Sequence, residues 1–367
     1  MKVNFLDLKS QYLSIKPEID EAIEKVFDKT AFAGGPFVAE FEENFAKAHR
    51  AKYCVAVNNG TSALHATLMA LDIGPGDEVI VPANTFFASA EAVSLAGAKP
   101  VFVECDEKYY NIDPTKIEGA ITAKTKAVFA VHLYGQPAPM DPIKAVTDKH
   151  DLMLLEDCAQ AHLATYKGQF VGNFGVTGSF SFYPGKNLGA YGEGGAVITN
   201  DQALYKKLQT IKDHGSDKKY YHKVIGHNYR MSGLQGAVLN VKLEHIANWT
   251  AKRRECADLY RKYLHGIDQI ILPESMPEAE HSYHLFVIRV QDREQLQQYL
   301  TENQIYTGIH YPIPCHLQEA YESLNYPVGS FPISEKYAKE ILSLPMSEQL
   351  KESEVQYVAE KLKAYYS

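Results

Sequence analysis

The sequence contains few cysteines, little tryptophan and no excess of basic residues. It has 5 cysteines and 1 tryptophan among 367 residues. The cysteines are widely separated and form no C-x-x-C pair, which argues against a disulfide scaffold or a structural zinc site and fits a reducing compartment. Lys and Arg total 37 against 45 Asp and Glu, a formal net charge of −8. This acidic balance argues against a general nucleic-acid-binding protein, which needs a basic face.

Long apolar runs are also missing. No stretch approaches the roughly 20 residues that a membrane-spanning helix needs, and residues 1–7 lack the apolar core of a signal peptide. We therefore expect a cytoplasmic protein without a membrane partner. The chain is 46% hydrophobic and 22% charged, which is typical of a globular protein, and its length predicts two domains or one large domain with an appendage.

Short apolar runs alternate with helical segments from residue 52 onward. Two helices come before them, one beginning near Pro17 and one after Gly35-Pro36. Such alternation predicts an α/β fold with a mainly parallel sheet that is covered by helices on both faces. The expected strands are Tyr53–Val57, Glu78–Val81, Pro100–Cys105, Ala127–Val131, Leu152–Leu155, Ser179–Phe182 and Ala196–Thr199.

The pattern changes after about residue 245. We expect a charged helix over Leu243–Tyr263, a strand Leu285–Val290, a helix Arg293–Glu302 and a strand near Ile305–Ile309. Residues 283–290 and 304–311 are expected to share one sheet. The sequence thus predicts a large α/β domain at residues 1–245 and a smaller α+β domain at residues 246–367.

Two polar motifs follow predicted strands directly. Asn59–Ser62 opens a predicted helix, whose free N–H groups and positive dipole end suit a phosphate, although an ordinary helix cap is the alternative. Glu156 and Asp157 end an apolar strand, where α/β proteins place functional groups. A buried carboxylate there needs a cation or donor as its partner, with a helix cap or a metal ligand as alternatives.

Lys186 lies just past a predicted strand, in a loop of glycines and aromatic residues. Partial burial beside another cation would lower the pKa of its amine and free it for Schiff-base chemistry, whereas a solvated loop lysine is the alternative. Ser181, at the end of the same strand, could donate to a phosphate.

Residues 212–230 form a basic and aromatic segment with a formal charge of +3. It suits a nucleotide diphosphate, or is a solvated loop. Further along the chain, His310 and His316 with Cys315 raise the possibility of a metal site. No acidic or thiol set of suitable spacing accompanies them, so we expect no metal.

Taken in order, these motifs resemble those of the sugar aminotransferases of the DegT/DnrJ/EryC1/StrS family. The resemblance covers essentially the whole chain and is carried by Asn59–Leu64, Glu156–His162 and Ser181–Leu188. It implies fold type I of the pyridoxal-phosphate enzymes, the aspartate aminotransferase fold, whose large domain holds a seven-stranded, mainly parallel sheet.

The resemblance implies pyridoxal 5'-phosphate (PLP) as the cofactor. Lys186 matches the lysine that forms the Schiff base, and Asp157 matches the carboxylate paired with the pyridinium nitrogen; these are the two catalytic residues. The other implied cofactor contacts are Gly60, Thr61, Ser62 and Ser181 at the phosphate, Phe86 stacked on the ring, Gln160 near the ring hydroxyl, and Asn228 reaching the phosphate of the neighbouring subunit.

Within the family the resemblance is closest to enzymes that make dTDP-3-amino-3,6-dideoxyhexoses, and it is carried by Tyr183–Gly189 and His310–Gln318. It implies that L-glutamate donates its amino group to the C3 keto group of a dTDP-linked 3-keto-6-deoxyhexose, by ping-pong kinetics in a homodimer. Such products serve the glycosylation of surface polysaccharides, including lipopolysaccharide and S-layer glycans, or of secondary metabolites. The implied sugar contacts are Tyr183, His310 and Tyr311, with Lys219 and Tyr221 from the partner meeting the diphosphate.

Other functions stay open at this point. A nucleotide-4-keto-sugar 4-aminotransferase, a sugar dehydratase of the same family and a non-catalytic regulatory relative all have the same fold. Lys186 counts against the dehydratase, because some of those enzymes have histidine there, and a regulatory protein needs neither Lys186 nor Asp157. No arginine lies between Arg50 and Arg230, so the motif loops of the sheet domain provide no arginine clamp for a dicarboxylate donor.

Overall fold

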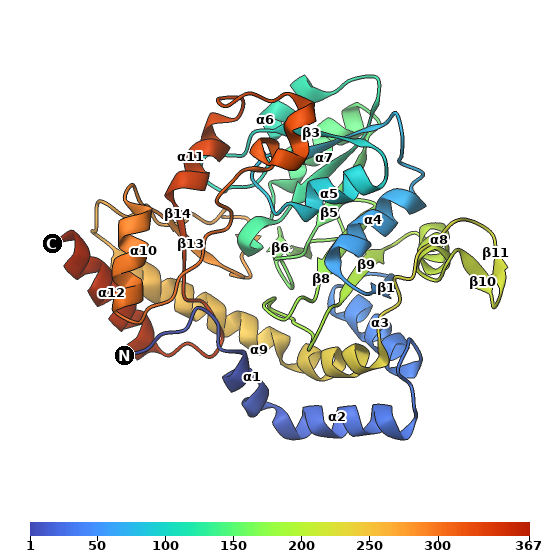
Figure 1. Ribbon diagram of the computed structural model, residues 1–367, viewed down its shortest axis with the longest axis horizontal. Helices are drawn as coiled ribbons and strands as arrows, with labels where there is room; N and C mark the ends of the chain where they lie inside the picture. The colour runs from blue at the N-terminus through green and yellow to red at the C-terminus, as the bar shows by residue number, and fades with distance from the viewer.

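A seven-stranded sheet organises the molecule. The computed structural model describes residues 1–367, and Figure 1 shows the sheet between layers of helices. Its strand order is β1-β9-β8-β5-β4-β2-β3, and only β9 runs antiparallel to its neighbours. The strands are β1 (Tyr53–Val57), β2 (Glu78–Pro82), β3 (Lys99–Val103), β4 (Thr125–Val131), β5 (Met153–Asp157), β8 (Thr177–Ser181) and β9 (Gly195–Thr199). All seven predicted strands are confirmed, with ends within two residues of the expected ones.

Apolar side chains cover both faces of this sheet. In β2, Val79 and Val81 pack on one face against α4 (Gly60–Ala70) and α5 (Ala88–Leu95). Ile80 points to the opposite face and packs with residues of α6 (Pro114–Ile117) and α7 (Met140–Lys149). Because alternate residues of a strand point to opposite faces, a strand buried on both sides is apolar throughout.

Helices at the N-terminus flank the sheet domain. The two predicted helices are present as α2 (Lys16–Asp28) and α3 (Pro36–Ala48), and both begin with a proline in the first turn. A further helix, α1 (Leu8–Ser14), was not expected. It is capped by Asp7, whose side chain accepts from the Ser10 N–H, and it has only one buried residue, so its sequence carries no apolar period.

One long helix joins the two predicted domains. α9 (Gly233–Leu264) follows α8 (Gln202–Lys212) and begins ten residues before the expected start at Leu243. Its first half packs into the sheet domain through Leu239 and Ile246. Its second half packs into a separate C-terminal core through Tyr260 and Leu264. The domain boundary at 245/246 lies within this helix and stays a prediction.

The C-terminal part holds a small two-stranded sheet. β13 (Phe286–Arg289) pairs with β14 (Ile341–Leu344), a strand that the sequence did not indicate because its four residues are all buried and directly follow a helix. The segment expected to form a strand near 305–309 makes only two single bridges, Val3 to Ile305 and Gly308 to Ser343. It therefore lies beside β14 and not beside β13. The helices here are α10 (Arg293–Glu302), α11 (Pro332–Glu340) and α12 (Glu352–Tyr366).

The remaining elements are short. β10 (Ser216–Lys218) and β11 (Tyr221–His222) form a hairpin that projects from the body of the molecule (Figure 1). β6 (Thr165–Tyr166), β7 (Gln169–Phe170) and β12 (Ala279–Glu280) form a small sheet, and 3-10 turns cover Glu118–Ala120, Leu133–Gly135, Cys315–Leu317 and Glu319–Leu324. None of the helices combines the length and apolarity that crossing a membrane requires.

Candidate active site

A cavity of about 950 Å³ opens at the carboxyl ends of the parallel strands. Its lining includes the residues that follow β1, β2 and β4 and the last residues of β5 and β8. Segments of the C-terminal part close the other side through His284, His310 and Tyr311. This is the edge at which α/β sheets bind ligands. Lys186 is the only lysine or arginine of the lining.

The first turn of α4 forms one end of the cavity. Asn59 caps the helix by accepting from the Ser62 N–H at 2.8 Å, while the N–H groups of Gly60 and Thr61 come before any acceptor in the helix. A Cβ on Gly60 would lie 2.6 Å from the Cβ of Ser181, so only glycine lets the helix start against the end of β8. The hydroxyls of Thr61, Ser62 and Ser181 consequently border the same end of the cavity.

Asp157 points into the cavity from the end of β5. Its carboxylate accepts from the Ser89 hydroxyl at 2.7 Å and from the Ala159 N–H at 3.0 Å. Both donors are neutral, and the residue is only 6% exposed. A buried carboxylate requires compensation of its charge. The cavity is therefore built to receive a cationic group next to Asp157.

Lys186 faces the same cavity from a tightly anchored loop. The backbone N–H of Lys186 donates to the Tyr183 carbonyl at 2.8 Å. Two side chains also hold the loop: the Asn187 amide donates to the Ser282 carbonyl at 2.9 Å, and the Lys242 ammonium donates to the Gly189 carbonyl at 2.7 Å. Burial lowers the pKa of the Lys186 amine to about 8, partly opposed by the charge of Asp157. About a tenth of the amine is thus unprotonated at pH 7, far more than for a solvated lysine.

Gln160 is held in one orientation on the floor of the cavity. Its Oε1 accepts from the Tyr134 N–H at 2.6 Å and its Nε2 donates to the Tyr311 hydroxyl at 3.0 Å. The Tyr311 ring lies 5.2 Å from the ring of Phe86. Phe86 is 51% exposed although it lines the cavity, so it offers an aromatic face to a flat ligand.

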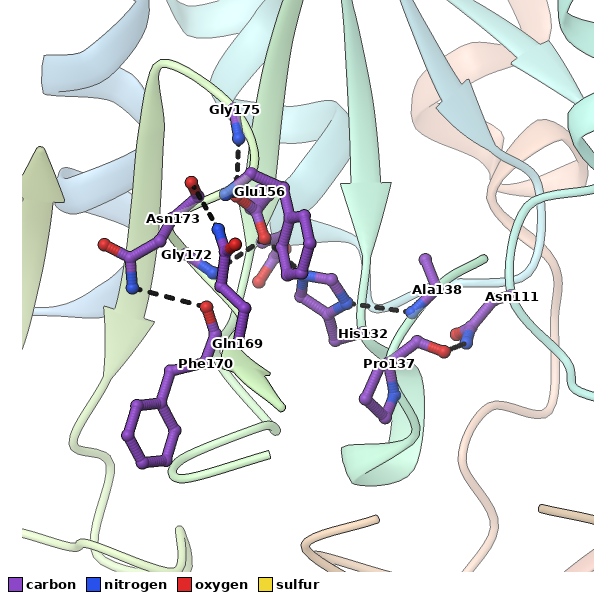
Figure 2. A network of polar contacts seen from close by, with 12 residues as sticks. Asn111, His132, Pro137, Ala138, Glu156, Gln169, Phe170, Gly172, Asn173 and Gly175 are labelled. Atoms are coloured by element: carbon purple, nitrogen blue, oxygen red, sulfur yellow. Dashed lines mark hydrogen bonds and ion pairs between the residues drawn. The ribbon is translucent and has the colours of Figure 1, made fainter. Parts of the chain in front are cut away.

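A buried network supports the β5 end from behind (Figure 2). Figure 2 shows Glu156 between His132 and the loop at Gly172–Gly175. Its carboxylate accepts from His132 Nε2 at 3.0 Å and from the N–H groups of Gly172, Phe174 and Gly175 at 2.6, 2.7 and 2.8 Å. The Ala138 N–H donates to His132 Nδ1 at 2.9 Å, so the neutral ring has its proton on Nε2.

The same network contains a cluster with metal-ligand chemistry. His132, Glu156 and Cys158 place one ligand atom each within 4.8 Å of one another. Both nitrogens of His132 and both oxygens of Glu156 are already hydrogen-bonded within the chain. The cluster therefore stabilises the end of β5, where Asp157 lies. Sequence reasoning missed His132, because nothing near it in the sequence links it to Glu156.

The metal alternative considered for the C-terminal motif does not assemble. His310 Nδ1 lies 2.8 Å from the Ser343 hydroxyl, His316 Nε2 lies 3.1 Å from Glu335, and the Cys315 thiol contacts the Thr85 carbonyl. The three side chains thus have separate partners.

The structure brings most of the implied site residues together. Those that line the cavity are Gly60, Thr61, Ser62, Phe86, Asp157, Gln160, Ser181, Tyr183, Lys186, His310 and Tyr311. Lys219, Tyr221 and Asn228 lie outside the lining, and Tyr221 is 62% exposed on the β10–β11 hairpin. Their implied place at the neighbouring subunit's site stays a prediction.

Several lining residues had no signal in the sequence. His284 comes from the segment before β13, and burial together with the nearby Lys186 lowers its pKa well below the usual range. Phe5 comes from the N-terminus. Ser89, the second residue of α5, lies outside the lining but donates a hydrogen bond to Asp157. Each becomes part of the site only through tertiary contacts.

These groups fit pyridoxal phosphate. The α4 start and the three hydroxyls suit a phosphate, Asp157, whose two hydrogen-bond donors are neutral, suits a protonated ring nitrogen, and Phe86 offers a stacking face. Lys186 supplies an amine of lowered pKa that can form a Schiff base. The fit rests on the donors, charges and aromatic face present in the cavity.

Comparisons with known proteins agree with this chemistry. The sequence is 46% identical over 363 residues to the dTDP-3-amino-3,6-dideoxy-alpha-D-galactopyranose transaminase of Aneurinibacillus thermoaerophilus, with 99% of each chain covered. It is also 46% identical over 368 residues to a "pleiotropic regulatory protein" of Geobacillus stearothermophilus, covering 100% of this chain and 99% of that one.

A solved structure has the same fold throughout. The crystal structure of S. venezuelae DesV in complex with a ketimine intermediate matches with a TM-score of 0.98 at 42% identity, covering 100% of this chain and 99% of that chain. The family match itself extends over residues 13–363, so it includes both the sheet domain and the C-terminal part that close the cavity. This protein therefore belongs to the DegT/DnrJ/EryC1/StrS aminotransferase family.

Proposed function

We propose that this PLP-dependent aminotransferase transfers the amino group of L-glutamate to the C3 keto group of a dTDP-linked 3-keto-6-deoxyhexose. The product is a dTDP-3-amino-3,6-dideoxyhexose, a precursor for glycans of the lipopolysaccharide or S-layer type or for secondary metabolites. The observation that carries the proposal is the cavity in which Lys186 and Asp157 face the start of α4. Two relatives that are named as dTDP-3-amino-sugar transaminases, at 46% and 43% identity, support the sugar.

The chain's own residues have distinct roles in this reaction. Thr61, Ser62 and Ser181 hold the cofactor phosphate, and Asp157 holds a proton at the ring nitrogen. Bound PLP supplies an electron sink for the negative charge that develops at the substrate carbon. The Ser89 bond keeps the Asp157 carboxylate aimed at the cavity while protein covers its other side.

Lys186 is the proton carrier. With PLP bound, the free amine of Lys186 would take the proton from the substrate carbon of the donor and deliver it to the cofactor carbon that carries the nitrogen, and it would move a proton the opposite way for the keto sugar. A pKa of about 8 leaves this amine able to act as a base near neutral pH. Phe86 and Gln160 fix the plane of the cofactor ring, and Tyr183, His310 and Tyr311 contact the sugar.

We extend the proposal to a cytoplasmic homodimer. In it, Asn228, Lys219 and Tyr221 of each subunit complete the other subunit's site. The proposal is supported by the cavity lining, which contains no cation except Lys186 for a diphosphate, and by the basic hairpin that projects from the body (Figure 1). The five cysteines are all free and buried, which supports a reducing compartment.

A two-step absorbance assay tests the function. The holoenzyme is first treated with L-glutamate, which removes the absorbance of the bound aldehyde cofactor. The treated enzyme is then mixed with dTDP-3-keto-6-deoxyglucose or dTDP-4-keto-6-deoxyglucose, and the masses of the products are measured by mass spectrometry. We expect the original absorbance to return, with a new amine, only with the 3-keto sugar, and the variant Lys186→Ala to show neither step.

Other outcomes point to the alternatives. Turnover of the 4-keto sugar alone would replace the C3 assignment by a 4-aminotransferase. No response to L-glutamate or to either sugar would overturn catalysis altogether and favour a regulatory protein.

A further inference from the structure

The ring of His310 is held on three sides. It stacks on Phe5 with ring centroids 5.7 Å apart and an angle of 18° between the planes. A Cβ on Gly308 would lie 2.7 Å from the His310 Cε1, so glycine is what lets the ring approach the backbone there. Its Nδ1 lies 2.8 Å from the Ser343 hydroxyl of β14, and the Tyr134 hydroxyl donates to the His310 carbonyl.

Ser343 determines which nitrogen of His310 carries the proton. The side chain is fully buried, at 0% exposure, and His310 Nδ1 is its only hydrogen-bond partner. A hydroxyl has one proton to donate, and a buried donor left without an acceptor costs more than an unused acceptor lone pair. The Ser343 hydroxyl therefore donates to Nδ1, and Nδ1 acts as an acceptor.

A neutral imidazole that accepts at Nδ1 has its proton on Nε2. Burial and the charge of Lys186 lower the pKa of His310 to about 4, so the ring is neutral near pH 7. Nε2 has no hydrogen-bond partner within the chain, and it is not one of the fully buried polar atoms that lack a partner. His310 also lines the cavity. The cavity thus contains a neutral N–H donor near Lys186.

We propose that Ser343 is a positioning residue that holds His310 as the Nε2–H tautomer, so that His310 donates a hydrogen bond to an oxygen of the acceptor keto sugar. A keto oxygen can only accept, so the opposite tautomer would turn a lone pair toward it. The inference rests on the proposed function, since it deepens the sugar contact assigned there to His310.

Enzyme kinetics in a double-mutant cycle test the positioning role. The variants are Ser343→Ala, His310→Ala and the double variant, each as holoenzyme in the two separate half-reactions. We expect Ser343→Ala to raise the KM for the 3-keto sugar about tenfold, the loss of one hydrogen bond, while its reaction with L-glutamate and its PLP affinity stay unchanged. In the His310→Ala background, Ser343→Ala should have no further effect on that KM, because the two residues act as one unit.

The control is Ser334→Ala, which removes another buried serine hydroxyl of the C-terminal part. Ser334 bonds Glu104 at 2.5 Å, away from the cavity lining, so the sugar KM should not change. Additive effects of Ser343→Ala and His310→Ala, or equal losses with L-glutamate and the sugar, would overturn the proposal.

The tautomer is measured directly by NMR of holoenzyme labelled with [15N]histidine. The His310 signals are identified by their loss in His310→Ala. We expect an Nε2–H tautomer in the wild type and its redistribution in Ser343→Ala; an Nδ1–H tautomer in the wild type would overturn the assignment. This readout needs no substrate, so failure of the wild type to use the 3-keto sugar overturns the proposed function separately.

Discussion

At the residue scale, the protein surrounds Lys186 with groups that carry no positive charge. His284 and His310 both have lowered pKa values because of burial and the nearby lysine. Two neutral histidines do not compete with Lys186 for the negative charge of Asp157. The lysine therefore interacts with the Asp157 carboxylate without a competing cation in the lining.

The lowered pKa of Lys186 predicts how cofactor attachment depends on pH. Only the free amine attacks an aldehyde, and the pKa of Lys186 is about 8. We expect the attachment rate of PLP to the apo protein to rise about tenfold per pH unit below that value and to level off above it. Stopped-flow absorbance from pH 6.5 to 9.5 measures this. A rate independent of pH over that range would contradict it, and Lys186→Ala provides the baseline.

Asp157 should be essential through its charge. In Asp157→Asn the amide keeps the size of the side chain but cannot hold a proton at the cofactor nitrogen. We expect the fold to be retained and kcat to fall about a hundredfold or more. Ser89→Ala is the matched control, because it removes one hydrogen bond and leaves the carboxylate, and should cost only a few-fold in kcat. Equal losses in the two variants would argue against the charge as the cause.

At the scale of elements, the site depends on the close approach of α4 to β8. Gly60→Ala would place a Cβ 2.6 Å from the Cβ of Ser181, so the helix start must shift away from the strand. Overpacking of this kind costs about 1–3 kcal/mol, and we expect the PLP dissociation constant to rise about tenfold or more in a fluorescence titration. Gly119→Ala, which meets no atom within 4 Å, should leave it unchanged.

The end of β5, where Asp157 lies, is held in place by the hydrogen bonds of the neighbouring Glu156. Four hydrogen bonds converge on one buried carboxylate, so β5, β4 and the segment at 172–175 keep a fixed geometry behind the cavity (Figure 2). A metal in this cluster would have to displace the hydrogen bonds of His132 and Glu156. The arrangement explains why two adjacent carboxylates at a strand end have different roles: Asp157 faces the ligand, and Glu156 faces the framework.

At the scale of the whole molecule, a buried histidine makes stability depend on pH. Burial lowers the pKa of His49 to about 4, below the roughly 6.5 of an unfolded chain. Between these values the unfolded state binds more protons, so stability rises with pH. We expect the free energy of unfolding to fall by about 2 kcal/mol from pH 7.5 to pH 5 through His49 alone. Urea unfolding at both pH values measures this, and His49→Leu should show a smaller loss; an equal loss would assign it to other groups.

The proposed shared site predicts that two defective subunits complement each other. Lys186→Ala and Asn228→Ala homodimers should both be impaired, for loss of the amine and of the phosphate contact from the partner. Mixed dimers have one site with both residues intact. After the two are unfolded and refolded together, we expect about a quarter of wild-type activity, because half of the dimers are mixed and each has one working site. Activity no higher than the average of the two homodimers would contradict a shared site.

The sequence alone determined the sheet and its chemistry. Seven apolar runs predicted seven strands, because a strand buried on both faces has little room for polar residues. The motifs at the strand ends predicted that Gly60, Asp157 and Lys186 lie at one edge of the sheet, since the carboxyl ends of parallel strands meet there, and the resemblance to the family implied further residues such as Phe86 and Gln160. These features are formed by residues that are close together in the chain, so their periodicity and spacing can be recognised in the sequence.

The tertiary structure decided what depends on contacts between distant segments. β14 pairs with β13 across more than fifty residues, and Phe5, Ser89, His132, His284 and Ser343 join the site or its support only when the chain is folded. Their roles come from burial and from single hydrogen bonds, which leave no periodic trace in a sequence. The tautomer assigned to His310 is the clearest case, because it depends on one buried hydroxyl that lies 33 residues away along the chain.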